Sequence, residues 1–270
     1  MQVRVTQPSI AVSLVSHGHG ELVLQALHAL SASVREVQVS LRVWLTLNLP
    51  EPALQSAVQE CDWPFELTQI DNPHPLGFGA NHNQAYALSR AVEGGSDWFV
   101  VMNPDIFWPH DGTAFWQSLL IDWSSDVGLV CPAQTDQQGR RQDFARGLMT
   151  PWGMVWRVLR RLLGASPSGV ADSVDQADWI NGACMVWRAQ AFAAVGGFDK
   201  RYFMYCEDTD ICLRLRLAGW RMREAEVTVV HDARRNTGRS WRHLSWHIRS
   251  MLRLWCSRAY WAYLLRFKAL

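Results

Sequence analysis

The 270-residue sequence lacks any long apolar run. A spanning helix needs about 18 or more consecutive apolar residues, and no such stretch occurs, so we expect none. The first ten residues, MQVRVTQPSI, lack the basic segment and small-residue cleavage site of a secretory signal peptide. Hydrophobic content is 49% and charged content is 19%, which is enough apolar side chain for a folded core. We therefore expect a globular cytoplasmic protein.

Paired cysteines are also missing. The six cysteines are scattered along the chain and form no CxxC pair: Cys61, Cys131, Cys184, Cys206, Cys212 and Cys256. This spacing argues against a zinc site and favours reduced thiols in a cytoplasmic protein.

Acidic residues are absent from the C-terminal end. Nine basic residues follow Asp232 without one acid: Arg234, Arg235, Arg239, Arg242, Arg249, Arg253, Arg258, Arg266 and Lys268. The preceding part carries 17 basic and 25 acidic side chains, a net charge of −8, although the whole chain has +1. The molecule is therefore expected to be polarised, with an acidic body and a basic tail.

Two common nucleotide-binding motifs, GxGxxG and GxxxxGK[ST], do not occur, which excludes the dinucleotide fingerprint and the P-loop. Some segments instead have the apolar pattern of a strand, and the segments between them have the apolar period of a helix. Strands are predicted at 9–16, 37–47, 65–70, 97–102 and 127–132, and helices at 21–30, 51–60, 80–92 and 113–120. This order predicts an α/β fold with a mostly parallel open sheet. Ligands should then bind at the loops 16–20, 48–50, 71–79 and 103–105, which follow the strands.

Residues 133–178 are less regular. A strand is predicted at 179–188, a short helix at 189–195 and another strand at 225–230, ending at His231.

Asn103-Pro104-Asp105 follows a buried strand. Proline ends the strand and fixes the backbone, so Asp105 should project from the carboxyl edge of the sheet. A carboxylate there can hold Mg²⁺ together with phosphate oxygens. The alternative is an ordinary turn residue that caps the next helix.

Three carboxylates fall within four positions at Glu207, Asp208 and Asp210. Apolar residues at helical spacing follow, and Gly219 marks a helix end, so the acids should lie at a helix N-terminus. The helix dipole stabilises one or two such charges. A partly desolvated carboxylate with acidic neighbours is also what a general base needs, and Asp208 is our candidate.

His231 ends a predicted strand and can be a metal ligand or a structural histidine. The basic segment 234–240 that follows it can bind a diphosphate or be a solvated loop.

Together these motifs resemble the family 2 inverting glycosyltransferases of the GT-A fold. The similarity runs through NPHPLGFGANHNQA, WFVVMNPDIFW, the whole block 179–220 with GGFDKRYFMYCEDTD, and VVHDARRNTGRS, and it covers about residues 9–240. It is strongest to the bacterial branch that includes rhamnosyltransferases.

The resemblance implies a role for each matching residue. Asp105 and His231 would bind Mg²⁺ or Mn²⁺, and Asp208 would be the catalytic base, beside Glu207 in the same motif. The donor-nucleotide site would contain Ser16, His17, Gly18, Asn48, Gly77, Phe78, Asn83 and Asn103. Two positions depart from the family pattern: Asn48 stands where an aspartate is usual, and Pro75 where many relatives have asparagine. Asn48 can still bond a pyrimidine edge, but as both donor and acceptor.

The implied activity is inverting, metal-dependent transfer of a sugar, rhamnose in this branch, from a nucleotide diphospho-sugar. The acceptor would be a hydroxyl of a growing cell-surface polysaccharide or lipid-linked glycan. One alternative is a nucleotidyltransferase, but SHGHGE after the first strand lacks the expected basic residues. Another is an inactive scaffold, which would have lost Asp105 or Asp208. We expect no nucleic-acid partner, and a homo-oligomer stays open.

Residues 1–240 are predicted to form the glycosyltransferase domain, with a nucleotide-binding half to 132 and an acceptor and catalytic half at 133–240. Residues 241–270 are predicted to form a basic amphipathic helical tail, with Arg242, Arg249 and Arg253 away from its apolar face. That face consists of Trp241, Leu244, Ile248, Leu252 and Trp255. It would lie in the inner surface of the cytoplasmic membrane, or pack on the body or a second subunit.

Overall fold

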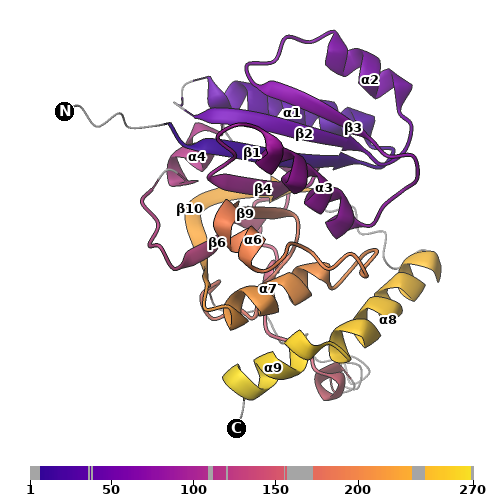
Figure 1. The fold of residues 1–270 in the computed structure, drawn as a ribbon, viewed down its shortest axis with the longest axis vertical. Coiled ribbons are helices and arrows are strands. Elements are labelled where there is room, and N and C mark those ends of the chain that lie inside the picture. Colours follow the sequence, from indigo (N-terminus) through magenta and orange to yellow (C-terminus); the bar gives the residue numbers. More distant parts are fainter. Residues whose placement is uncertain are drawn as a thin grey trace.

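The structure, a computed structural model, describes residues 7–35, 37, 39–108, 112–119, 121–154, 156, 173–232 and 241–268. The strands are β1 (Ser9–Ser16), β2 (Ser40–Leu47), β3 (Glu66–Asp71), β4 (Trp98–Met102), β5 (Ile106–Phe107), β6 (Val127–Thr135), β7 (Ala145–Arg146), β8 (Trp179–Ile180), β9 (Cys184–Arg188) and β10 (Arg221–His231). The helices are α1 (Gly20–Val34), α2 (Pro52–Gln59), α3 (Phe78–Ala91), α4 (Thr113–Leu119), α6 (Ala189–Ala194), α7 (Glu207–Leu217), α8 (Trp241–Trp255) and α9 (Arg258–Phe267). The predicted alternation of strands and helices is confirmed (Figure 1).

Eight strands form one twisted sheet in the order β3-β2-β1-β4-β9-β6-β10-β5. The first four strands in this order are parallel, as predicted, and β6 and β10 are parallel to each other. Strand β9 runs antiparallel between β4 and β6, and β5 is antiparallel to β10. The expected mostly parallel α/β sheet is therefore confirmed, with two antiparallel strands. The sheet also runs without interruption past residue 132, so the two predicted halves share it.

Helices cover both faces of the sheet because its strands are apolar on both sides. On β1, Val12 packs in a cluster with α1, α2 and α4, while its neighbour Ala11 packs in a second cluster with α3, α6 and α7. A third cluster lies outside α7, where α8 and α9 pack, at the bottom of the view in Figure 1. The C-terminal helices are thus part of the packed body.

The predicted single strand at 179–188 is wrong. Strand β8 and strand β9 belong to different sheets, and residues 181–183 turn between them. At Gly182 an added Cβ would lie 3.0 Å from Cζ of Phe78. The chain therefore leaves the sheet here to pass beneath an aromatic ring, and a larger residue at this position would have to displace that ring.

The predicted C-terminal helical tail is confirmed, as two helices. The first ends at Trp255, and Ser257 caps α9 by accepting a hydrogen bond from the Tyr260 N–H at 3.1 Å. Met251 and Leu254 of α8 are buried with Tyr260 and Tyr263 of α9. The last two residues of the predicted tail lie outside the described residues, as does the basic segment 234–240.

Of the predicted apolar face of α8, Trp255 packs in the third cluster, whereas its other four members are exposed. Trp241 is 87% exposed, and Leu244, Ile248 and Leu252 are 43%, 50% and 54% exposed. Within the described ranges, no helix combines the length and apolarity needed to cross a bilayer.

Candidate functional site

Three of the predicted ligand-binding loops meet at the carboxyl ends of β1, β2 and β3 through Asn48. This buried side chain donates from Nδ2 to the Leu76 carbonyl at 2.9 Å and lies 3.1 Å from His17 Nδ1. Its Oδ1 accepts from the Leu76 N–H at 2.8 Å and from Asn72 Nδ2 at 2.9 Å. Asn48 therefore holds the loops together, and a direct contact with a nucleotide base stays a prediction.

The loop after β1 presents one imidazole to solvent. Ser16 is buried, and its hydroxyl accepts a hydrogen bond from the His19 N–H at 3.3 Å. Gly18 has a φ of +78° and donates its N–H to Glu51 Oε1 at 3.0 Å. Partial burial, and then the neighbouring His19, lower the pKa of His17, so its exposed ring is neutral at physiological pH.

The segment that begins α3 is attached to the loop leading to α7. Phe78 donates its N–H to the Phe203 carbonyl at 2.9 Å, and a Cβ on Gly77 would lie only 2.5 Å from that same oxygen. Asn83 bonds both backbone groups of Phe198, at 2.7 and 2.9 Å. The predicted nucleotide segment is thus hydrogen-bonded directly to the loop before the acids.

Asp105 and His231 are brought together by the pairing of β5 with β10. His231 lies opposite Ile106, and His231 Nε2 is 3.7 Å from Asp105 Oδ1. That oxygen is buried and accepts no hydrogen bond from the described residues. Burial raises the pKa of Asp105, and the charge of His231 opposes this rise.

These two residues fit a hard divalent cation. Among the described residues, no cluster of three or more His, Cys, Asp or Glu side chains that could hold a metal occurs. Mg²⁺ characteristically uses one or two carboxylates and completes its shell with water and substrate phosphates. A carboxylate oxygen without a hydrogen-bond donor, next to an imidazole, suits such a shared site.

The segment 181–183 connects this edge with the acidic helix. Asn103 donates its N–H to the Ala183 carbonyl at 2.8 Å, which places the Asn-Pro-Asp turn beside it. Asn181 forms a reciprocal amide pair with Gln134 at 2.8 and 2.9 Å. On its other side, a Cβ on Gly182 would lie 3.9 Å from Cβ of Asp208.

Asp208 is the accessible carboxylate at the start of α7. It is half-buried, and its Oδ1 accepts the Thr209 N–H at 2.7 Å. Burial raises the pKa of Asp208, while that hydrogen bond and the charge of Arg146 on β7 lower it. The raised pKa favours proton transfer close to neutral pH.

The other two acids have different surroundings. Asp210 is buried and accepts from Arg214 Nε at 2.8 Å, which makes it a structural partner one helical turn away. Glu207 is also buried, and its Oε2 has no hydrogen-bond partner among the described residues. Burial and the charge of Asp208 hold the pKa of Glu207 well above its ordinary value.

Helix α8 holds the strained loop before these acids, a role that the sequence did not reveal. Tyr205 and Cys206 have φ values of +71° and +64°, a left-handed conformation that costs roughly 1–2 kcal/mol per residue. The Tyr205 hydroxyl lies 2.9 Å from His243 Nδ1, and Ser250 donates to the Met204 carbonyl at 2.8 Å. No local pattern marks such contacts, which join residues about forty positions apart.

His82 was also missed. It is buried, its Nδ1 lies 2.8 Å from the Ser13 hydroxyl, and its ring meets Phe78 edge-on with centroids 4.5 Å apart. Burial lowers the pKa of His82 to about 3, so it is a neutral support for Phe78. The sequence offered one indication of this contact: His82 follows Phe78 by four residues, so the two side chains lie on the same face of a helix.

Comparison with known families now decides the class of protein. A sequence profile described as "Glycosyltransferase like family 2" matches residues 8–256. The chain belongs to this family. The expected enzyme class, a glycosyltransferase, is thereby confirmed, and the match extends into α8.

Two relatives of this glycosyltransferase are rhamnosyltransferases. Rhamnosyltransferase WbbL of Escherichia coli is 27% identical over 257 residues, which cover 90% of this chain and 91% of that protein. N-acetylglucosaminyl-diphospho-decaprenol L-rhamnosyltransferase of Mycobacterium tuberculosis is 30% identical over 200 residues. That match covers 65% of this chain and 62% of the mycobacterial protein. The expected similarity to the rhamnosyltransferase branch is confirmed.

The fold agrees with solved glycosyltransferases. The mannosyltransferase PcManGT from Pyrobaculum calidifontis, solved with GDP-Man and Mn²⁺, superposes with a TM-score of 0.60 at 16% identity. The match covers 92% of this chain and 65% of that one. The expected GT-A fold is confirmed, and the roles of the individual site residues stay predictions.

Proposed function

We propose that this glycosyltransferase moves rhamnose from a nucleotide diphospho-sugar to a hydroxyl of a lipid-linked glycan, with inversion at the anomeric carbon. The observation that carries the proposal is the position of Asp208. It stands across Gly182 from the ring of Phe78, on the side of the sheet where the predicted nucleotide loops end. The names of the two bacterial relatives support the sugar, and the mycobacterial name supports an acceptor on a lipid diphosphate.

In the proposed reaction, the acceptor oxygen attacks the anomeric carbon while its proton passes to a carboxylate oxygen of Asp208. The new carbon–oxygen bond forms as the bond to the donor phosphate breaks, and the nucleotide diphosphate leaves with the electron pair. A single displacement of this kind inverts the anomeric centre. The raised pKa of the buried neighbour Glu207 disfavours a second negative charge next to the base.

Asp105 and His231 would hold a Mg²⁺ or Mn²⁺ ion. When bound, such an ion neutralises charge on the leaving diphosphate as a Lewis acid. The loops joined by Asn48 would orient the nucleotide, and the segment 181–183 would separate donor from base.

A panel of nucleotide diphospho-sugars tests this proposal, with a sugar-diphospho-lipid as acceptor and with Mg²⁺, Mn²⁺ or EDTA. The expected result is transfer from a rhamnose donor, loss of turnover in EDTA, and an inverted linkage by NMR. Transfer of the nucleotide itself would favour the nucleotidyltransferase alternative. Nucleotide-sugar binding without turnover, for every donor and metal, would favour the inactive scaffold.

We also propose that α8 rests on an anionic membrane surface. Its outward side chains Trp241, Leu244, Ile248 and Leu252 are exposed, and the described part of the chain after Asp232 carries basic residues without acids. Interfacial helices combine these two features, and each basic residue near anionic lipid contributes about 1 kcal/mol. A lipid-linked acceptor would be met at such a surface.

Sedimentation with phosphatidylglycerol vesicles tests the membrane contact. The wild type should bind at low salt and dissociate as salt rises, whereas a Trp241→Ser, Ile248→Ser variant should bind weakly with an unchanged melting temperature. Wild-type protein that ignores these vesicles would refute the contact. A dimer that the same variant dissociates would show that this face joins two copies of the chain.

A further inference from the structure

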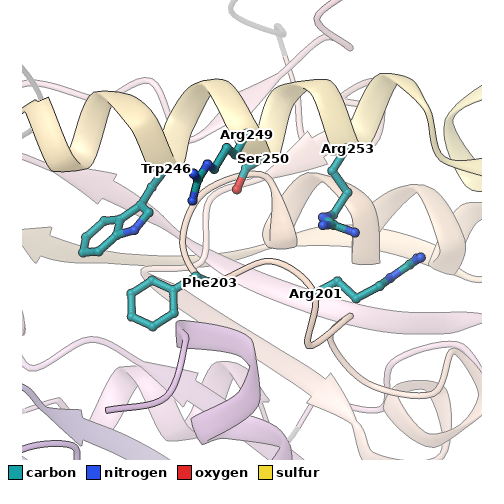
Figure 2. A pocket seen from close by; sticks show the side chains of 6 residues that line it. All are labelled: Arg201, Phe203, Trp246, Arg249, Ser250 and Arg253. Atoms are coloured by element: carbon teal, nitrogen blue, oxygen red, sulfur yellow. The ribbon is translucent and has the colours of Figure 1, made fainter.

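A cavity of about 330 Å³ lies between α8 and the loop before α7, and the proposed reaction does not use it. Trp246, Arg249, Ser250 and Arg253 line it from one side of α8, and Arg201 and Phe203 line it from the loop (Figure 2). Figure 2 shows the arginine side chains of α8 extending toward that loop.

The lining of this arginine pocket carries three positive charges and no carboxylate. Arg201 is neutralised by Asp199, whose carboxylate accepts from its guanidinium at 2.6–3.0 Å. Arg249 and Arg253 make no hydrogen bond or ion pair within the described part of the chain, and both are exposed. Two unpaired guanidinium groups one helical turn apart repel each other unless an anion lies between them.

The rest of the lining beside the arginines is aromatic or already hydrogen-bonded. The rings of Phe203 and Trp246, with centroids 4.8 Å apart, form an apolar wall beside the arginines. The Ser250 hydroxyl is already used in its bond to Met204. Guanidinium groups pair with phosphate oxygens in a bidentate manner, and they do so better than lysine.

The pocket lies close to the predicted catalytic groups. The Phe203 carbonyl accepts a hydrogen bond from the Phe78 N–H, and Asp208 follows Phe203 by five residues. At the other end of α8, Arg242 is near enough to His17 to influence its pKa. Helix α8 therefore borders the site and carries the arginines on one side and exposed apolar residues on another.

We infer that the arginine pocket binds the phosphate groups of the acceptor, the diphosphate that joins its sugar to the lipid. The inference rests on the proposed transfer to a lipid-linked glycan. The donor diphosphate has its own predicted place at Asp105 and His231, so the pocket is a second phosphate site with a separate substrate.

Steady-state kinetics of Arg249→Gln and Arg253→Gln test the inference, with Arg258→Gln as the control. Arg258 is exposed on α9, outside the pocket lining. Each pocket variant should raise KM for a sugar-diphospho-lipid about 10-fold or more, the effect of losing a charge-assisted hydrogen bond. KM for the donor, the melting temperature and all properties of the control should stay unchanged.

A phosphate-free glycoside of the same acceptor sugar separates phosphate binding from other effects. The wild type should use it poorly, and the pocket variants should use it no worse than the wild type. Equal losses on both acceptors, or a higher KM for the donor alone, would overturn the inference. So would variants that lose binding to phosphatidylglycerol vesicles while their KM for the acceptor stays normal.

Calorimetry with inorganic pyrophosphate provides a measurement that needs no turnover. The wild type and Arg258→Gln should bind it in the absence of metal, and the double variant Arg249→Gln, Arg253→Gln should not. If no donor is turned over but this difference appears, the proposed reaction fails and the anion pocket stands. Identical binding by all three proteins would refute the pocket.

Discussion

Three neighbouring carboxyl groups at the start of α7 have three different surroundings. Asp210 is paired with Arg214, Glu207 is buried without a hydrogen-bond partner, and Asp208 is half-buried beside Gly182. Apolar spacing predicted the helix N-terminus that carries the group, and Asp208 stays the predicted base. The different surroundings of Glu207 and Asp210 could not be predicted, because they depend on which side of the helix faces the core.

Replacing Asp208 with asparagine should abolish transfer while nucleotide binding persists. The change keeps the shape of the side chain and the Thr209 N–H bond but removes the proton acceptor. A general base typically contributes about 10²–10⁴-fold to the rate. Turnover and nucleotide affinity should be measured on the same preparation. Activity within a few-fold of the wild type would rule out this role.

The acid limb of the rate profile should reflect the raised pKa of Asp208. Because burial raises this pKa, the carboxylate is protonated at a higher pH than an exposed aspartate, whose pKa is about 3.9. The base is active only when ionised, so kcat should fall as pH falls through the raised value. Rates from about pH 4 to about pH 9 would locate the limb. A limb at the pKa of an exposed aspartate would contradict the assignment.

At the scale of elements, close contacts between distant segments decide where the site is built. Gly77 lies against the Phe203 backbone, and Gly182 lies against the Phe78 ring. The order of strands and helices could be predicted from apolar periodicity, since that is a local property. The turn at Gly182 could not, because the ring against which it packs is about a hundred residues earlier in the sequence.

A Gly77→Ala substitution should therefore destabilise the protein and slow transfer together. The new methyl group would overlap the Phe203 carbonyl, which belongs to backbone and cannot rotate away. Overpacking of this kind typically costs about 1–3 kcal/mol. The melting temperature and the turnover rate should therefore both fall. The matched control is Gly147→Ala, where the nearest atom would be 3.8 Å away, and comparable losses there would remove the explanation.

At the scale of the whole molecule, the C-terminal helices belong to the folded body more than the sequence suggested. The predicted tail face is exposed except at Trp255, while Met251 and Leu254 pack with Tyr202 and Leu213. Charge and helical spacing indicated an amphipathic segment correctly. They could not show which side packs, because two apolar stripes run along it.

Removal of residues 241–270 should therefore unfold the protein and not merely detach it from membranes. Each large apolar side chain that becomes exposed lowers the free energy of unfolding by about 1.5–3 kcal/mol. A domain has a free energy of unfolding of only about 5–15 kcal/mol in total. We expect the shortened chain to show no cooperative thermal transition. A cooperative transition close to that of the full chain would show that α8 and α9 contribute little.

The insertion of β9 between β4 and β6 has a consequence for synthesis on the ribosome. Val100 pairs with Val186, so one edge of β4 stays without its partner strand until the ribosome has added 86 more residues. At about 5–20 residues per second, this delay is roughly 4–17 s. Amide exchange on stalled nascent chains should show the β4 amides on the β9 side unprotected until residues 184–188 emerge, while those on the β1 side can already be protected. The nascent chain must therefore keep an apolar strand edge from self-association for seconds, a period in which a chaperone can bind it.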